Sequence, residues 1–496
     1  MVNLLLLKIG SEPGLEEIPN IIRRLDPEIS VFGILTTPNQ TNHFDHVVSS
    51  SYDAMFGAHE EWFSEGLYVR PELYKVISAA EGRIVRMYDR LAMSDTTVYA
   101  APRHPIPRFH DSTEYRMQLF LRQAAFWDHK LRLHKIDAVV AQNYGHIGYD
   151  AVLFEVVKAL GIPYMFFHDF PPFRGSLQIY ESVGDIVSNQ LSRTVIEYAR
   201  DNFPFLPDSA DRRKRMMYQI GLLGEAKGQT PSKSETNTLM KLKMLLSKEG
   251  ITRNVLKSVR RRWNNSRSKR DEKHALSDSP LPEKFLFCEL QSQPNGTTAL
   301  KGWMFPDQRE SLALIARHLP SDWKLVVKES HRQWTRMYPR RKKFWSHIAL
   351  LPKVHVVSSN YDTTVLLQNC SGLVETSYSN LALSAIQQGL QVIVLGLTHI
   401  GDLIGVNVVT SEEQAAEVVP RVCAQNGQRS NRDLLTESLT RFVDEKRVAT
   451  FEGTLGYIPK FSSEAEKREF CARTSVNVSS VIVAWLHLAI PNEFHN

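Results

Sequence analysis

Short apolar runs alternate with amphipathic stretches along the first 190 residues of the chain. Continuous or alternating apolar runs are typical of strands, and apolar residues that recur every three to four positions are typical of helices. The strand-like runs lie at 2–10, 29–37, 137–143 and 163–170, and the helical patterns lie at 14–26, 112–136 and 148–162. Strand and helix in alternation predict a parallel sheet with helices on both faces.

The same alternation returns from Lys284 onward. Strands are predicted at 284–290, 323–330, 354–359, 371–376 and 391–396, and helices at 307–319, 340–351, 362–369 and 380–389. We therefore predict an α/β fold of two Rossmann-like domains that face an interdomain cleft, with a polar helical or linker insertion between them. The expected segments are 1–200, 201–283, 284–460 and 461–496, the last a C-terminal helix that crosses back.

Length and composition agree with this division. A chain of 496 residues is too long for a single core, and 43% apolar with 23% charged residues is typical of a globular protein. The four cysteines form no CxxC pair, which favours a reducing compartment over a disulfide framework or a zinc site. The apolar run in "MVNLLLLKIG" reads as a buried strand and not as a signal peptide. We expect a cytoplasmic protein. A peripheral position on the inner face of the membrane is a second option.

The net charge of +6 is unevenly distributed, and 257–273, "KSVRRRWNNSRSKRDEK", is strongly basic. A run of this kind is most often a solvated linker. A basic segment that carries a Trp also suits an anionic membrane surface. Nucleic-acid binding is disfavoured, because no nucleic-acid motif accompanies the run.

Polar residues follow three predicted strands of the C-terminal half. Ligands of open α/β sheets bind outside the carboxyl ends of the strands, so these residues are expected to lie together at one edge. The loop at 377–379 also leads into a helix, where free N–H groups and the positive dipole end suit a phosphate. The purely structural explanations of these polar residues are ordinary helix capping and solvated loops. The candidate donor-binding residues are Gln293, Pro294, Lys328, Glu375, Ser377, Ser379 and Asn380, and Glu329 and His331 are candidates for the chemistry.

The N-terminal half has similar strand ends. Asp150 lies in the first turn of a predicted helix, where a carboxylate either stabilises the helix dipole or acts as a base or nucleophile. Sequence position alone leaves both roles open. The other candidate residues on this acceptor side are His146, His168, Asp169 and Arg174.

Several familiar motifs are missing from the sequence. GxGxxG at the first strand–helix junction, GxxxxGK[ST], GxSxG and HExxH do not occur. Dehydrogenases, P-loop NTPases, α/β-hydrolases and zincins therefore lose most of their support. We expect neither a metal nor a cofactor.

One ordered set of segments resembles a known family. The segments "QSQPNGTT", "PDQ", "LPSDWKLVVKESHRQ" and "ETSYSNLALSAIQQGLQVIVLG" lie between residues 285 and 396, and "YGHIGYDAVLFEVVKALGIP" lies in the N-terminal half. In order and spacing they are similar to capsule and surface-polysaccharide biosynthesis proteins, a group related to the retaining β-Kdo transferases. The chain departs from the family pattern at Lys328-Glu329-Ser330-His331, where the His is displaced by one position, and at Thr376-Ser377-Tyr378, which lacks a Gly.

The resemblance implies a GT-B-like glycosyltransferase that needs no metal. Its C-terminal domain would bind a nucleotide-sugar donor, CMP- or UDP-linked, and its N-terminal domain would bind a glycan or glycolipid acceptor. Asp150 is the candidate catalytic carboxylate. Two alternatives stay open: an epimerase or hydrolase of nucleotide sugars on the same fold, and a non-catalytic glycan-binding or assembly protein.

Overall fold

The structure is a computed structural model of the whole chain. It describes residues 1–9, 15–35, 43–50, 66–93, 113–143, 145, 148–170, 172–173, 176–182, 190–208, 212–220, 263, 266–293, 298, 301–302, 304–330, 333, 340, 343–377, 379–425, 432–453, 455 and 463–490. The chain forms two compact units, unit 1 from residues 1–219 and 441–496 and unit 2 from residues 220–440. The four-segment division expected from the sequence stays a prediction.

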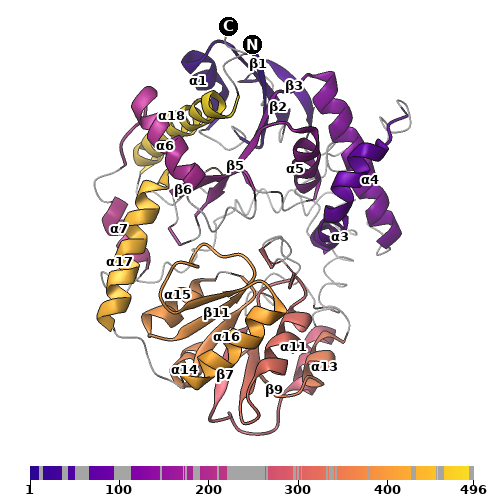
Figure 1. The fold of residues 1–496 in the computed structure, drawn as a ribbon, viewed down its shortest axis with the longest axis vertical. Coiled ribbons are helices and arrows are strands. Elements are labelled where there is room, and N and C mark those ends of the chain that lie inside the picture. The colour runs from indigo at the N-terminus through magenta and orange to yellow at the C-terminus, as the bar shows by residue number, and fades with distance from the viewer. Residues whose placement is uncertain are drawn as a thin grey trace, which may run out of the picture. The chain divides into compact units, whose positions relative to one another are not determined.

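Unit 1 is built on a seven-stranded sheet with the order β13-β6-β5-β4-β1-β2-β3 (Figure 1). Its strands are β1 (Val2–Leu7), β2 (Ile29–Leu35), β3 (His46–Ser50), β4 (Ala138–Ala141), β5 (Tyr164–Asp169), β6 (Ser176–Tyr180) and β13 (Phe451–Glu452). Strands β1 to β5 pair in parallel. The central strand β1 is buried on both faces, which explains its unbroken run of leucines.

Eight helices of the described residues accompany this sheet. They are α1 (Ile18–Leu25), α3 (Pro71–Met93), α4 (Thr113–Leu133), α5 (Tyr149–Leu160), α6 (Gln190–Asn202), α7 (Arg212–Gln219), α17 (Arg432–Val448) and α18 (Glu464–Ala489). The boundary between the units falls inside α17. Helix α18 packs beside α1 and α6 (Figure 1). Its residues Val478, Val481 and Ile482 are fully buried in the core of unit 1, which is why the last predicted helix is so apolar.

Unit 2 is built on a six-stranded, wholly parallel sheet with the order β12-β11-β10-β7-β8-β9. Its strands are β7 (Phe285–Glu289), β8 (Lys324–Lys328), β9 (Val354–Val357), β10 (Gly372–Glu375), β11 (Gln391–Leu395) and β12 (Val406–Val409). Its helices include α11 (Gln308–His318), α13 (Phe344–Ala349), α14 (Thr363–Asn369), α15 (Asn380–Gln387) and α16 (Glu412–Ala424). The predicted fold class, two Rossmann-like α/β sheets, is confirmed.

Strands β6 and β13 depart from the parallel arrangement. Strand β6 pairs antiparallel with β5, and β13 pairs antiparallel with β6. Only residues 170–175 connect β5 to β6, and a parallel crossover needs roughly a dozen residues or more. The hydrophobic pattern also missed β3 and β12, because short strands at the edge of a sheet bury few side chains.

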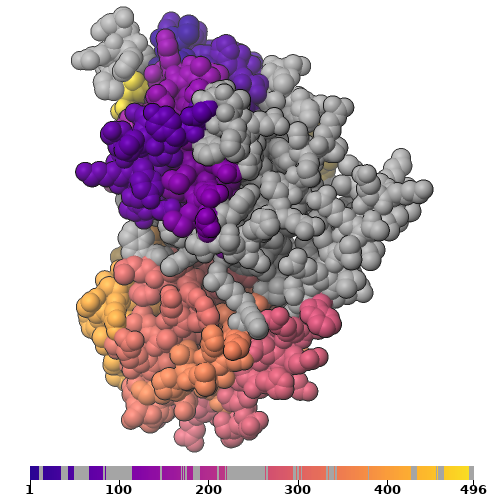
Figure 2. All heavy atoms as spheres, turned by 90° about the vertical axis from the view of Figure 1, so that its right-hand side faces the viewer, coloured from indigo at the N-terminus to yellow at the C-terminus, as the bar shows by residue number. Residues whose placement is uncertain are grey.

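The described part of the basic run belongs to unit 2. Residues 266–275 are helical, and Ser268 and Glu272 are buried on one side of this helix. Its basic residues Arg267, Lys269, Arg270 and Lys273 are exposed. Figure 2 shows this part of the chain, coloured rose, on the surface of unit 2. None of the helices in the described residues has the length and apolarity that crossing a bilayer requires.

Candidate functional site

The strand order of unit 2 reverses between β7 and β10. From β7 the chain continues to β8 and β9 on one side, and it then returns to β10, β11 and β12 on the other side. At such a switch point, the loops that follow two adjacent strands run in opposite directions. Ligands of open α/β sheets bind in the crevice between these loops, outside the carboxyl ends of the strands. The predicted donor residues follow β7, β8 and β10, so they belong to this edge.

Two reciprocal hydrogen-bond pairs fix the loop that follows β7. The side-chain amide of Gln308 donates to Gln291 O (2.9 Å) and accepts from Gln291 N (2.9 Å). The side-chain amide of Gln333 does the same for Gln293, at 2.7 and 2.8 Å. Each glutamine therefore takes the place of a neighbouring strand, and the loop keeps an extended course without a partner strand.

The Gln293 side chain is engaged within unit 2. Its Nε2 donates to Pro306 O (2.7 Å), and its Oε1 accepts from Arg340 (3.4 Å). The structure thus gives Gln293 a positioning role in the loop.

A buried ion pair lies under the same loop. The guanidinium of Arg340 donates to both carboxylate oxygens of Glu329, at 2.8 and 2.6 Å, and both side chains are at most 2% exposed. Arg340 also donates to Gln291 O (2.9 Å) and stacks over the Phe344 ring, 4.7 Å from its centroid. Glu329 was predicted to take part in the chemistry, and in this structure its carboxylate anchors Arg340 beneath the loop.

The switch point itself is bridged by Gln291 and Ser377. Gln291 Nε2 donates to Ser377 O, and Ser377 Oγ donates to Gln291 Oε1, both at 2.7 Å. Ser377 is fully buried. The loops after β7 and β10 are therefore joined by two hydrogen bonds, which fixes the entry to α15.

Helix α15 begins at this junction. Ser379 is its N-cap, and its Oγ accepts from Leu381 N (3.0 Å), while Ser379 N donates to Glu375 Oε2 (2.9 Å). Burial raises the pKa of Glu375 to about 8, although hydrogen bonds from Ser379 act to lower it. Glu375 is therefore mostly protonated at pH 7. Asn380, the first helical residue, is exposed, so the positive end of the helix faces solvent.

Lys328 lies at the carboxyl end of β8. Its Nζ donates to Thr363 Oγ1 at the start of α14 and lies 3.8 Å from Glu289 Oε1. Of the donor-side candidates, Lys328, Glu329, Gln293, Glu375, Ser377, Ser379 and Asn380 are therefore all at the carboxyl edge of this sheet. Pro294 and His331 lie outside the described residues.

Unit 1 has its own switch point, between β1 and β4. Lys8 follows β1 in a left-handed conformation (φ 62°), and its Nζ donates to Asp150 Oδ2 (3.1 Å). Asp150 Oδ1 accepts from Gly148 N and Ala151 N in the first turn of α5. Burial lowers the pKa of Lys8, but Asp150 and Tyr149 outweigh it, and the net shift is upward. Asp150 is only 3% exposed. The structure thus shows the helix-stabilising role of this carboxylate.

Gly145 makes this packing possible, since a Cβ there would lie 2.2 Å from Ala151 N. Among the acceptor-side candidates, His168 is buried on β5, and its ring centroid lies 6.4 Å from that of Tyr180. Asp169 ends the same strand. His146 and Arg174 lie outside the described residues.

Four residues that build the unit 2 site had no role predicted from the sequence. They are Gln291, Gln308, Gln333 and Arg340. Gln308 belongs to the quoted "PDQ" segment, and Arg340 lies in a run of basic residues that resembles an ordinary charged surface. In the part of the chain that the structure describes, no group of His, Cys, Asp and Glu could hold a metal ion.

Comparison with known proteins finds only distant similarity. No family model matches the chain, and no curated protein matches it. Three of the similar solved structures are a Methanocaldococcus jannaschii UDP-GlcNAc 2-epimerase with UDP-GlcNAc and UDP, a Rickettsia africae glycosyltransferase, and an Anabaena protein with UDP and glucose. Their identities are 9%, 10% and 10%, and their TM-scores are 0.25, 0.24 and 0.23. The matches cover 90%, 100% and 96% of this chain and 99% of each of the other chains. Similarity at this level assigns neither family nor activity.

Proposed function

We propose that the chain is a glycosyltransferase that moves a sugar from a nucleotide donor to a glycan or glycolipid of the cell surface. The observation that carries the proposal is the junction of Gln291, Ser377 and Ser379 at the switch point of unit 2. It holds the exposed N-terminus of α15 at the place where α/β sheets bind ligands.

The chemistry of this junction suits a nucleoside diphosphate or monophosphate. Backbone N–H groups and the positive dipole end of α15 favour a phosphate. A protonated Glu375 adds no negative charge that would repel this anion at neutral pH. The buried pair Glu329–Arg340 fixes the loop and leaves no net charge. The donor is therefore a UDP- or CMP-linked sugar in this proposal.

Changing Asn380 to Asp tests the donor site. The added carboxylate at the first position of α15 stabilises the helix by about 0.3–1 kcal/mol, but it repels a bound phosphate. We expect an unchanged or slightly higher melting temperature together with at least about tenfold weaker UDP or CMP binding, measured by calorimetry. Gln414→Glu is the matched control, because it adds the same charge to the first turn of α16, at the far strand β12. Equal loss of nucleotide affinity in both variants, or in neither, contradicts the donor site.

The reaction class is tested with sugar nucleotides and saccharide acceptors. Acceptor-dependent release of the nucleotide supports transfer. Release without an acceptor indicates a hydrolase, conversion of the donor sugar indicates an epimerase, and binding without turnover indicates a non-catalytic protein.

Asp150 is the candidate catalytic carboxylate in this proposal, and Asp150→Asn is expected to abolish turnover while it preserves nucleotide binding. Unchanged turnover in that variant would leave Asp150 with the helix-stabilising role alone.

We also propose that the basic helix of residues 266–275 brings the enzyme to an anionic membrane. Arg267, Lys269, Arg270 and Lys273 are exposed, and each basic residue near such a surface contributes about 1 kcal/mol. Replacing these four residues by Gln is expected to abolish co-flotation with phosphatidylserine vesicles. Co-flotation that is undiminished, or equal with neutral vesicles, contradicts this part of the proposal.

A further inference from the structure

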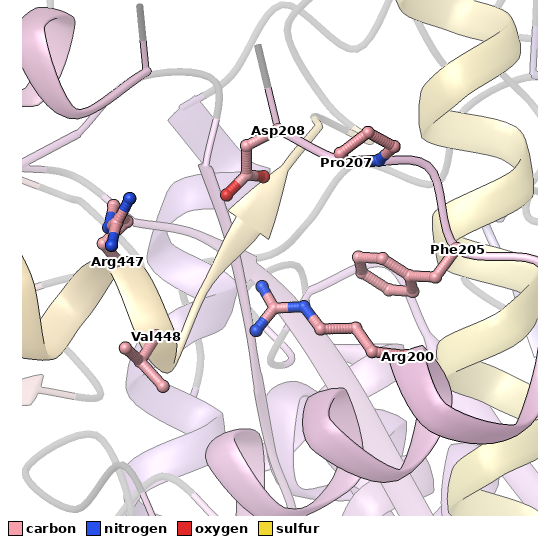
Figure 3. A pocket seen from close by; sticks show the side chains of 6 residues that line it. All are labelled: Arg200, Phe205, Pro207, Asp208, Arg447 and Val448. Atoms are coloured by element: carbon pink, nitrogen blue, oxygen red, sulfur yellow. The ribbon is translucent and has the colours of Figure 1, made fainter. Parts of the chain in front are cut away.

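A pocket lies within unit 1, at its β13 edge. It has a volume of about 420 Å³ and is lined by Arg200, Phe205, Pro207, Asp208, Arg447 and Val448 (Figure 3). This volume falls in the range of small-molecule sites. None of these residues belongs to the donor site or to the switch point between β1 and β4.

Neither arginine of the pocket is paired with a carboxylate among the described residues, and Arg447 acts on the nearby Asp444 only through its charge. Neither Arg200 nor Arg447 forms a hydrogen bond or an ion pair with any residue that the structure describes. Arg200 instead lies over the Phe205 ring, 5.3 Å from its centroid. In Figure 3 its guanidinium extends into the space between Asp208 and Val448, and Arg447 lies on the other side of that space.

The neighbouring carboxylates are already neutralised by other arginines. Asp208 forms an ion pair with Arg212 and accepts from Glu452 N (3.2 Å). Asp444, near Arg447, accepts from Arg213 Nε at 2.7 Å and from Arg213 Nη2 at 2.9 Å. Burial lowers the pKa of Arg212, and the nearby positive charge of Arg200 lowers it further, against the effect of Asp208. The pocket therefore carries excess positive charge.

A purely structural role for the two arginines is the competing explanation. Both lie in the last turn of a helix, where a cation complements the dipole. The carbonyls of these last turns, however, have other donors. Asn202 Nδ2 donates to Tyr198 O in α6, Thr450 Oγ1 donates to Lys446 O in α17, and Arg212 donates to Thr450 O. Carbonyls near both helix ends thus accept from donors other than Arg200 and Arg447.

We infer that this pocket binds a phosphate monoester whose phosphate is attached to a ring or another apolar body. Guanidinium groups bind phosphate through paired, charge-assisted hydrogen bonds. Phe205, Pro207 and Val448 supply an apolar wall that an inorganic anion would leave uncovered. The ligand is held by two cations and packs against this wall.

Calorimetry on the full chain with phenyl phosphate tests the inference. We expect phenyl phosphate to bind at least about tenfold more tightly than inorganic phosphate or phenol, and the double change Arg200→Ala and Arg447→Ala to weaken it at least about tenfold. Arg24→Ala is the matched control, because Arg24 is also an exposed cation in the last turn of a unit 1 helix. Asn380→Asp, at the donor site, should leave the phenyl phosphate affinity unchanged.

Four results would overturn the inference. Three are no binding of phenyl phosphate by the unaltered protein up to about 10 mM, equal binding by the double-arginine variant, and equal loss of binding in Arg24→Ala. The fourth is loss of phenyl phosphate binding in Asn380→Asp alone, which would place the ligand at the donor site. A circular dichroism melt of each variant keeps misfolding apart from lost affinity.

Discussion

Changing Arg340 to Met is expected to destabilise the protein by about 3–5 kcal/mol. Arg340 donates to both oxygens of Glu329 and to Gln291 O, and the ion pair is almost fully buried. Its removal leaves a carboxylate in the interior without a counter-ion and a carbonyl without a donor. Urea unfolding measures the loss directly, and fast proteolysis in the loop after β7 should accompany it.

Two further variants show whether the buried charge is the cause. Glu329→Gln in the Arg340→Met background removes the uncompensated charge and should recover more than half of the lost stability. Arg317→Met is the surface control. Arg317 pairs with Glu412, but both side chains are more than half exposed, so the loss should stay below about 1 kcal/mol. A loss for Arg340→Met as small as that of Arg317→Met would show that the ion pair does not hold the loop.

The hydrophobic pattern predicted most of the buried parallel strands, but it missed the buried strand β6. Strands β1, β7 and β10 carry unbroken apolar runs because helices cover the sheet on each side. It missed β3 and β12, which lie at the ends of their sheets and keep partly exposed side chains. The hydrophobic pattern also did not predict the antiparallel pairing of β5 and β6, because apolar runs carry no information about strand direction.

The candidate site was predictable only where it follows from topology. Residues at the carboxyl ends of β7, β8 and β10 had to share one edge of the sheet, and they do. What each side chain contacts there was not predictable. Gln293 bonds Pro306 and Arg340, and Glu329 accepts two hydrogen bonds from Arg340, because partners from distant parts of the chain meet only in the folded sheet.

A buried lysine in unit 2, Lys301, is expected to make the stability of the protein depend strongly on pH. Lys301 is 2% exposed, and its Nζ lies 2.8 Å from His399 Nε2. Its backbone O accepts from Leu397 N (2.7 Å), two residues after the end of β11. Burial lowers the pKa of Lys301 from 10.5 to about 7. Folding therefore favours the neutral amine.

The sign of the pH dependence follows from proton binding. Between pH 7 and pH 10.5 the unfolded chain keeps the Lys301 proton while the folded chain has lost it. The free energy of unfolding from this group therefore rises with pH in that window, by up to about 1.4 kcal/mol for each pH unit. Below pH 7 both states carry the proton, and the dependence disappears.

Changing Lys301 to Met should remove this rise. We expect the stability of the unaltered protein, relative to Lys301→Met, to increase by about 2–3 kcal/mol between pH 7 and about pH 9, measured by urea unfolding at each pH. Taking the difference between the two proteins cancels other titrating groups, including Glu375, whose raised pKa acts in the opposite direction up to pH 8. Lys284→Met is the control, because Lys284 pairs with Asp322 on the surface and its difference should stay flat over this range. A flat difference for Lys301→Met would mean that the amine remains protonated beside His399 in the folded protein.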